Sequence, residues 1–163
     1  MSKKPVFFSF HFDKDVMRVQ LVRNIGSLEG NSPVSANEWE SVKRGGDQSI
    51  MRWIDENMKY KQCVIVLIGK ETSERPWVNY EIQKAWDDNR PIFGIYIHNL
   101  KCPRAGKSKK GKNPFEQFTF DDGQKLSSIV ACYDPKADDA YNDIAENMDS
   151  WVNTAIAQKR VSV

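Results

Sequence analysis

A seven-residue apolar run at 63–69 (CVIVLIG) constrains the fold of this chain most strongly. It is rich in β-branched residues, and apolar and polar side chains do not alternate along it. A strand with one wet face alternates, whereas a strand inside a parallel sheet is buried on both faces and forms a continuous apolar run. We therefore predict a buried strand here and another at 91–97 (PIFGIYI).

The N-terminal segment predicts a strand followed by a helix. The bulky apolar run at 6–10 (VFFSF) indicates the strand. Asp13 is the expected N-cap of a helix over 14–25, because Asp at that position accepts hydrogen bonds from the first turn. Gly26 is expected to end this helix, since glycine tolerates the left-handed conformation that follows many helices.

The segment 26–46 is rich in Gly, Ser and Asn and is expected to be mostly loop. A short extended piece at 32–35 could form a second strand there. Trp39 stands in this polar segment, and a ring of that size must find a surface to contact. A helix over 47–58 should follow, with its apolar residues facing inward.

The remaining chain adds further strands and helices. Pro76 suits the first turn of a helix that should end near residue 89. The apolar residues at 128–133 predict a last strand, and an amphipathic closing helix is expected over about 137–158. The basic run at about 101–112 contains no acidic residue and is expected to form a mobile, solvated insertion.

The alternation of strands and helices predicts an α/β fold with three layers, in which helices flank a mostly parallel sheet. A chain of 163 residues is long enough for one well-formed core. We expect a single domain over 1–163.

Three segments should meet at one edge of this sheet, because ligands of such folds bind beyond the carboxyl ends of the strands. Ser9, Phe10 and His11 end or follow the first strand. The segments 39–46 and 69–81 should reach the same edge. Aromatic, hydroxyl and carboxylate side chains should therefore lie together at this edge of the sheet.

The helix after residue 75 carries a Trp and a Glu one turn apart. Trp77 and Glu81 should share a face, whereas Val78, Ile82 and Ala85 form an apolar stripe. Glu81 would then lie off the stripe, toward a rim. One interpretation is a solvated surface Glu, which is the more common case. The other is a carboxylate in an aromatic cleft, able to stabilise a ribosyl cation as a cationic group leaves.

Other chemistries have little support. The net charge of +2 gives no case for nucleic acid, and no apolar run is long enough to span a membrane. His11 and His98 lack metal-ligand spacing, so no metal site is expected. Asp15 is interpreted as a surface charge rather than part of a phosphate-accepting site. The unpaired Cys63, Cys102 and Cys132 indicate a reducing, cytoplasmic location without a signal peptide.

Three stretches together resemble the TIR-like proteins of the bacterial Thoeris antiphage defence system. They are 6–11 (VFFSFH), the run at 64–69 leading to 75–82 (RPWVNYEI), and 91–97 with 113–115 (NPF) beyond. The second stretch matches the Trp-x-x-x-Glu pattern of enzymatically active TIR domains. The likeness spans about residues 5–115.

This resemblance implies a flavodoxin-like fold and an NAD-cleaving activity. NAD would be a substrate, so no cofactor is expected. Glu81 corresponds to the family's catalytic carboxylate. Ser9, Phe10 and His11 would line the nicotinamide side, with Trp77 and Tyr80 as aromatic walls. The loop after the second strand suggests Trp39 and Arg44 as further substrate contacts.

The resemblance also implies partners. These are self-association through TIR–TIR contacts, a phage-derived trigger, and a separate effector that a diffusible, ADP-ribose-derived signal would activate. Two alternatives remain open at this point. The chain could be a non-enzymatic TIR interaction module, or a flavodoxin-like binder of another small molecule such as a flavin or nucleotide.

Overall fold

The structure, a computed structural model, describes residues 4–25, 28–29, 41–101 and 106–162. Its sheet runs in the order β2-β1-β3-β4-β5, and every neighbouring pair is parallel. This order is that of a flavodoxin-like, doubly wound α/β fold, which confirms the predicted fold class. The strands are β1 (Lys4–Ser9), β2 (Leu28–Glu29), β3 (Cys63–Ile68), β4 (Ile92–Tyr96) and β5 (Cys132–Tyr133).

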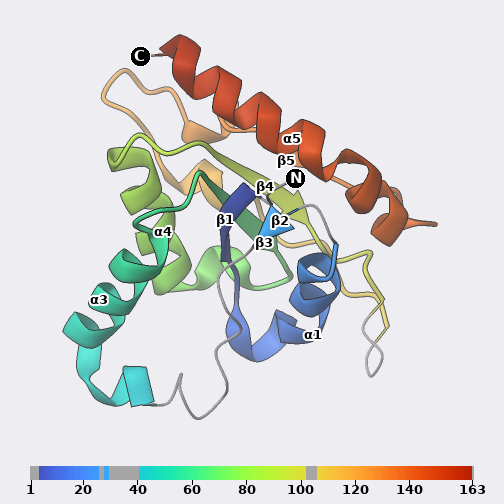
Figure 1. The fold of residues 1–163 in the computed structure, drawn as a ribbon, viewed down its shortest axis with the longest axis horizontal. Coiled ribbons are helices and arrows are strands. Elements are labelled where there is room, and N and C mark those ends of the chain that lie inside the picture. Colours follow the sequence, from blue (N-terminus) through green and yellow to red (C-terminus); the bar gives the residue numbers. More distant parts are fainter. Residues whose placement is uncertain (1–3, 26–27, 30–40, 102–105, 163) are drawn as a thin grey trace.

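Helices cover both faces of the sheet (Figure 1). The helices α1 and α5 lie over one face, and α3 and α4 lie over the other. Their bounds are α1 (Phe12–Arg23), α3 (Gly46–Met58), α4 (Pro76–Asp87) and α5 (Ala140–Ser162). Three short 3-10 helices are η1 (Thr72–Glu74), η2 (Pro114–Gln117) and η3 (Leu126–Ser128).

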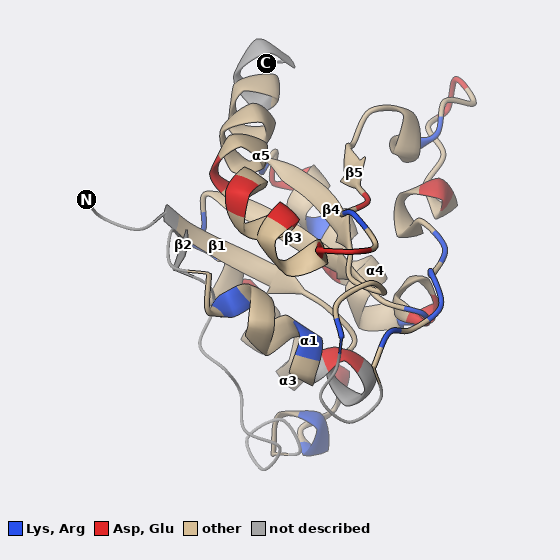
Figure 2. Ribbon diagram, turned by 90° about the vertical axis from the view of Figure 1, so that its right-hand side faces the viewer, with Lys and Arg blue, Asp and Glu red and all other residues tan. Residues whose placement is uncertain are grey.

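The central strand β3 is fully buried, as its continuous apolar sequence predicts. Cys63, Ile65 and Leu67 belong to the core beneath α1 and α5. The alternate residues of β3 belong to the core beneath α3 and α4. Burying one such aliphatic side chain stabilises the fold by roughly 1.5–3 kcal/mol. Neither β3 nor β4 contains a charged residue (Figure 2).

The first helix begins and ends earlier than expected. His11, rather than Asp13, is the N-cap of α1, and Asn24, rather than Gly26, is its C-cap. The backbone of His11 is extended and its carbonyl oxygen accepts a hydrogen bond from the Asp15 amide at 3.0 Å. The helix therefore starts almost directly after β1, which leaves no separate capping turn.

The segment before α3 also differs from its prediction. Residues 41–44 are helical, whereas loop was expected up to residue 46. The second strand is Leu28–Glu29, paired with β1. The predicted strand at 32–35 and Trp39 lie outside the described residues.

The C-terminal elements have shifted bounds. Only Cys132 and Tyr133 pair with β4, so the strand predicted over 128–133 is wrong in its first half, where the chain leaves η3. The closing helix runs over Ala140–Ser162 instead of about 137–158. Its start follows a turn in which the Lys136 amide donates a 2.8 Å hydrogen bond to Asp143 Oδ2.

The described part of the basic segment, 106–112, contacts the rest of the protein at Lys110 and Gly111. Lys110 forms a 2.9 Å ion pair with Asp134 and lies over the ring of Tyr96. The backbone of Gly111 passes so close to Gly69 that an added Cβ would come within 2.0 Å of the Gly69 carbonyl oxygen. The backbone at Gly111 is therefore held against the protein, while the lysine side chains of this part are exposed.

Candidate active site

Glu81 is a buried residue of α4, with a relative exposure of only 7%. The Ser9 hydroxyl, at the carboxyl end of β1, donates a hydrogen bond of 3.0 Å to Glu81 Oε1. Ser9 is itself fully buried. The end of the first strand and the helix that carries Glu81 therefore meet, as predicted for this edge of the sheet. The interpretation of Glu81 as a solvated surface residue is wrong.

The burial of Glu81 follows from the spacing of the apolar residues around it. Val78, Glu81, Ile82 and Ala85 are the buried residues of α4. Glu81 comes three residues after Val78 and four before Ala85, so it lies within the stripe rather than beside it. This spacing was visible in the sequence, but the charge of Glu81 favoured a surface position.

Burial raises the pKa of Glu81 from 4.5 to about 8, because an ionised carboxylate is poorly solvated in the interior. The hydrogen bond from Ser9 acts in the opposite direction, since it stabilises the ionised form. With a pKa of about 8, this carboxyl group is mostly protonated at neutral pH. A carboxyl group with a strongly perturbed pKa at a ligand-binding edge is a typical feature of an active site.

The turn before α4 holds the start of that helix in place. The Gly69 amide donates to Thr72 Oγ1 at 2.8 Å. The Ser73 carbonyl oxygen accepts two side-chain hydrogen bonds, from Asn79 Nδ2 at 3.3 Å and from Gln117 Nε2 at 2.7 Å. Pro76 occupies the first turn of α4, as predicted. The position of Glu81 thus depends on contacts with η1 and η2.

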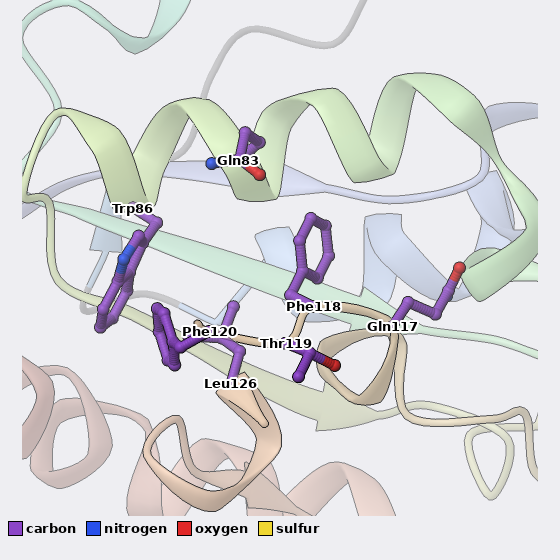
Figure 3. Close-up of a pocket in the computed structure, with 7 residues that line it drawn as sticks. All are labelled: Gln83, Trp86, Gln117, Phe118, Thr119, Phe120 and Leu126. Carbon is purple, nitrogen blue, oxygen red and sulfur yellow. The ribbon is translucent and has the colours of Figure 1, made fainter. Parts of the chain in front are cut away.

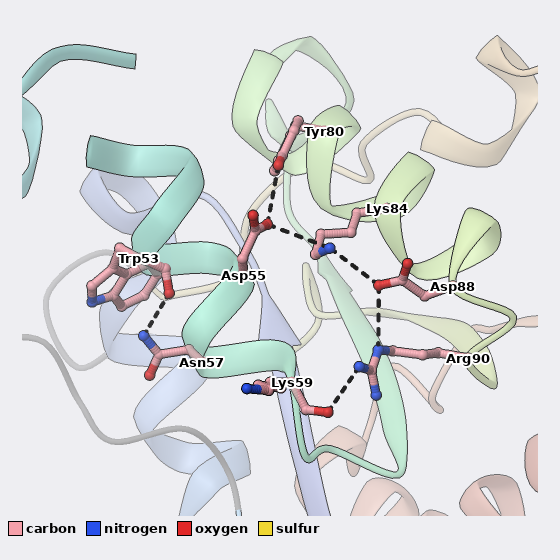
Figure 4. Close-up of polar contacts among 8 residues, drawn as sticks. All are labelled: Trp53, Asp55, Asn57, Lys59, Tyr80, Lys84, Asp88 and Arg90. Atoms are coloured by element: carbon pink, nitrogen blue, oxygen red, sulfur yellow. Dashed lines mark hydrogen bonds and ion pairs between the residues drawn. The ribbon is translucent and has the colours of Figure 1, made fainter. Parts of the chain in front are cut away.

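Trp77 and Tyr80 lie on the part of α4 that faces α3. Their rings meet edge to face, with centroids 5.6 Å apart. The Tyr80 hydroxyl donates to Asp55 Oδ1 on α3 at 3.1 Å, and Lys84 lies 3.5 Å from the same oxygen (Figure 4). Lys84 also pairs with Asp88 at 3.2 Å. Tyr80 therefore connects the helix that carries Glu81 to α3.

The other predicted site residues lie in different surroundings. Phe10 packs against the core beneath α1 and α5, on the opposite side of the sheet from Ser9 and Glu81. His11 is buried at the start of α1. Arg44 is exposed in the helical residues before α3. Trp39 lies outside the described residues.

A second buried polar pair, Asp15 and Arg18, was missed by the sequence analysis. Their side chains approach to 3.6 Å, and Arg18 also donates to the carbonyl oxygens of Leu100 and Gly106 at 3.0 and 2.8 Å. Burial raises the pKa of Asp15, and the nearby Arg18 acts against this. The expectation of a surface charge at Asp15 is wrong. The pair connects α1 to the segment after β4.

The described part of the chain offers few residues for metal binding or thiol chemistry. No group of three or more His, Cys, Asp or Glu residues there is placed to hold a metal ion. Burial raises the pKa of Cys132 to about 12, so its thiol stays protonated. None of the helices described is long and apolar enough to cross a membrane.

Comparison with known proteins identifies the relatives of this chain. Residues 7–102 match the family described as "Thoeris protein ThsB, TIR-like domain". The chain is also 31% identical to a Bacillus cereus (strain MSX-D12) protein named "Putative cyclic ADP-D-ribose synthase ThsB1". That alignment covers 92% of this chain and 99% of the relative.

Proposed function

The chain belongs to the Thoeris ThsB family of TIR-like proteins, and on that premise we propose that it cleaves NAD with Glu81 as the catalytic carboxylate. Nicotinamide would be released, and an ADP-ribose-derived, cyclic product would serve as a signal in antiphage defence. The observation that carries this proposal is the buried Glu81 carboxyl group, held by Ser9 at the carboxyl edge of a parallel sheet.

The reaction breaks the bond between C1′ of the ribose and the nicotinamide nitrogen. The electron pair of this bond goes to the nitrogen, so the pyridinium leaves as a neutral molecule and needs no proton. Positive charge develops on C1′ and the ribose ring oxygen, as in glycoside cleavage. A carboxylate in a site that excludes water stabilises such a charge more effectively than it would in solution.

The substrate would itself bring Glu81 into its active charge state. Before NAD binds, Glu81 would be largely protonated at neutral pH, because its pKa is about 8. The positive charge of the pyridinium favours the ionised carboxylate and therefore lowers this pKa. Glu81 would lose its proton as NAD binds, while Ser9 continues to donate to the carboxylate.

The product depends on what captures C1′. Water would give ADP-ribose, whereas a nitrogen of the substrate's own adenine would give a cyclic product. The printed name of the Bacillus cereus relative supports the cyclic outcome. Trp77 would shield the site from water. The remaining substrate contacts stay proposals that rest on the resemblance alone: Phe10, His11, Trp39, Arg44 and Tyr80.

We further propose, on the same family basis, that chains self-associate through TIR–TIR contacts and that a phage-derived trigger starts the reaction. The signal would diffuse to a separate effector. The cytoplasm is the expected location, because the NAD substrate is found there.

The experiment that tests this function measures nicotinamide and its co-product by mass spectrometry, in cells that express the protein with and without phage. Wild type should release nicotinamide and accumulate an ADP-ribose-derived product. Glu81→Gln should lose at least about two orders of magnitude of this activity, since it removes the charge that stabilises the cation. Glu146→Gln, an exposed residue of α5, is the matched control and should be active. Undiminished release from Glu81→Gln would remove Glu81 from the mechanism.

A further inference from the structure

A cavity lies between α4 and the segment 117–126, and its volume is about 310 Å³ (Figure 3). This volume falls at the lower end of the range of about 300–1,000 Å³ found for small-molecule sites. The lining residues are Gln83, Trp86, Gln117, Phe118, Thr119, Phe120 and Leu126.

The cavity is separate from the Glu81 site. Successive residues of an α-helix are rotated by about 100° around its axis. Gln83 therefore points about 160° away from Glu81, and Trp86 points about 140° away from it. The sheet-facing side of α4 carries Glu81, whereas the side facing residues 117–126 carries Gln83 and Trp86. One helix thus contributes to two sites.

Three aromatic rings form the apolar walls of the cavity. Trp86 comes from α4, and Phe118 and Phe120 come from the facing segment (Figure 3). The rings of Trp86 and Phe120 have centroids 5.6 Å apart and are inclined by 47°. All three residues are only partly buried, so ring surface remains accessible to a ligand. Such surfaces bind flat rings by stacking.

The polar groups of the cavity are neutral, and several can accept hydrogen bonds. Gln83 Nε2 donates to Asp87 at 3.0 Å, and Gln117 Nε2 donates to the Ser73 carbonyl oxygen at 2.7 Å. Among the described residues, the Oε1 atoms of these two amides accept no hydrogen bond. The Thr119 hydroxyl adds a group that can donate or accept. No lining residue is charged, so nothing in the wall would neutralise a phosphate or a cationic ring.

We propose that this cavity binds a neutral, planar heteroaromatic ring that carries amino or amide N–H groups. The aromatic walls would stack on the ring, and the Gln83 and Gln117 oxygens would accept its N–H groups. Two sources share this chemistry, namely an adenine base and free nicotinamide. The site is distinct from the one that would cleave NAD and requires no turnover. Gln117 would contact this ligand and also holds the Ser73 carbonyl before α4.

The test is a titration of the full chain with adenosine and, separately, with nicotinamide, followed by saturation-transfer NMR and calorimetry. Gln83→Glu introduces a negative charge into the neutral wall at an exposed position, so the fold should tolerate it. Trp86→Leu removes the indole surface. Each variant should weaken binding by about tenfold or more, as expected for the loss of one stacking partner or one matched polar contact. Gln48→Glu, an exposed residue of α3, is the matched control and should bind like wild type.

The two ligands and a catalytic-site variant separate the outcomes. Binding of adenosine alone would identify a purine, and binding of nicotinamide would identify the released product. In either case the binding must persist in Glu81→Gln and be weakened by about tenfold or more in Gln83→Glu. If neither ligand binds at millimolar concentration, or if Gln83→Glu and Trp86→Leu leave all binding unchanged, the proposal is wrong. Circular dichroism confirms that each variant is folded.

Discussion

At the scale of single residues, burial and hydrogen bonding act against each other on Glu81. Burial raises the pKa of this carboxyl group to about 8, and the hydrogen bond from Ser9 limits the rise. The folded state therefore retains a proton that the unfolded state has already lost over a wide range of pH. This difference has consequences for both stability and activity.

The stability of the fold should fall as pH rises from about 4.5 to about 8. In this range the unfolded chain ionises Glu81 but the folded chain does not, so the folded state binds more protons and the free energy of unfolding decreases with pH. Glu81→Gln removes this contribution. We expect the variant to be more stable than wild type at pH 8 by a few kcal/mol, and the difference to disappear near pH 4. Chemical denaturation at several pH values measures it, and equal pH profiles would contradict the raised pKa.

Ser9→Ala should change the pH profile of nicotinamide release as well as its rate. The variant loses the donor that stabilises the ionised Glu81, so the pKa of Glu81 rises further and the rising limb of the profile moves to higher pH. A purely structural role of Ser9 would lower the rate without moving the profile. Ser150→Ala, an exposed change on α5, serves as the control.

At the scale of elements, α4 is held from three sides. Tyr80 and Lys84 connect it to α3, the Ser73 turn fixes its start, and Glu81 reaches β1. Because several contacts fix this helix, a change on one side can reach the carboxyl group on another. The Tyr80 contact with α3 can be tested alone, since it uses a single hydroxyl group.

Tyr80→Phe should lower the free energy of unfolding by about 0.5–1.5 kcal/mol, the usual net value of one hydrogen bond. The edge-to-face contact with Trp77 stays in place. Asp55→Ala should cost less stability in the Tyr80→Phe background than when Tyr80 is intact, because the hydrogen bond is already broken there. Urea denaturation of the single and double variants gives this coupling energy. Additive effects would mean that the hydrogen bond contributes nothing measurable.

Gly111→Ala should destabilise the chain by more than about 1 kcal/mol. The added methyl group would lie 2.0 Å from the backbone oxygen of Gly69, and a backbone atom cannot move away as a flexible side chain could. The variant should also disturb the turn that leads into α4. Lys109→Ala, an exposed change in the same segment, should leave the melting temperature almost unchanged. Equal melting temperatures for the two variants would show that the close approach is not maintained in solution.

The sequence predicts best those strands and helices whose hydrophobic pattern has a single physical cause. Burial on both faces produces the unbroken apolar runs of β3 and β4, and both were located to within two residues. In contrast, β2 and β5 are paired over only two residues each, too short for a pattern. Glu81 was found as a candidate, but its burial was missed because charge was weighed above its position in the apolar stripe. The contact from Gln117 to Ser73 joins segments 44 residues apart, and nothing local predicts it.

At the scale of the whole molecule, the sheet separates two cores that use alternate residues of the same strands. One core lies beneath α1 and α5 and the other beneath α3 and α4. The proposed reaction belongs to the second side, at the edge where the strands end. The proposed assembly of chains acts at this scale too, because a neighbouring molecule could complete a site that one chain leaves open.

If self-association completes the active site, the rate of nicotinamide release per chain should rise with protein concentration. A single chain acting alone would instead give a constant rate per chain. Measurements over about a hundredfold range of concentration, together with light scattering, would distinguish the two. A constant rate per chain across a range in which the chains are seen to associate would contradict this part of the proposal.

The alternation of β1 has a consequence for how this family can change over evolutionary time. Phe7 and the Ser9 hydroxyl face the α4 side, while Phe8 and Phe10 face the other. Deleting or inserting one residue within the strand would exchange the two sides and present a phenyl ring to Glu81 in place of a hydroxyl group. Insertions or deletions within β1 are therefore tolerable only two residues at a time. Selection for the active site thus also acts on whether the length of this short strand is odd or even.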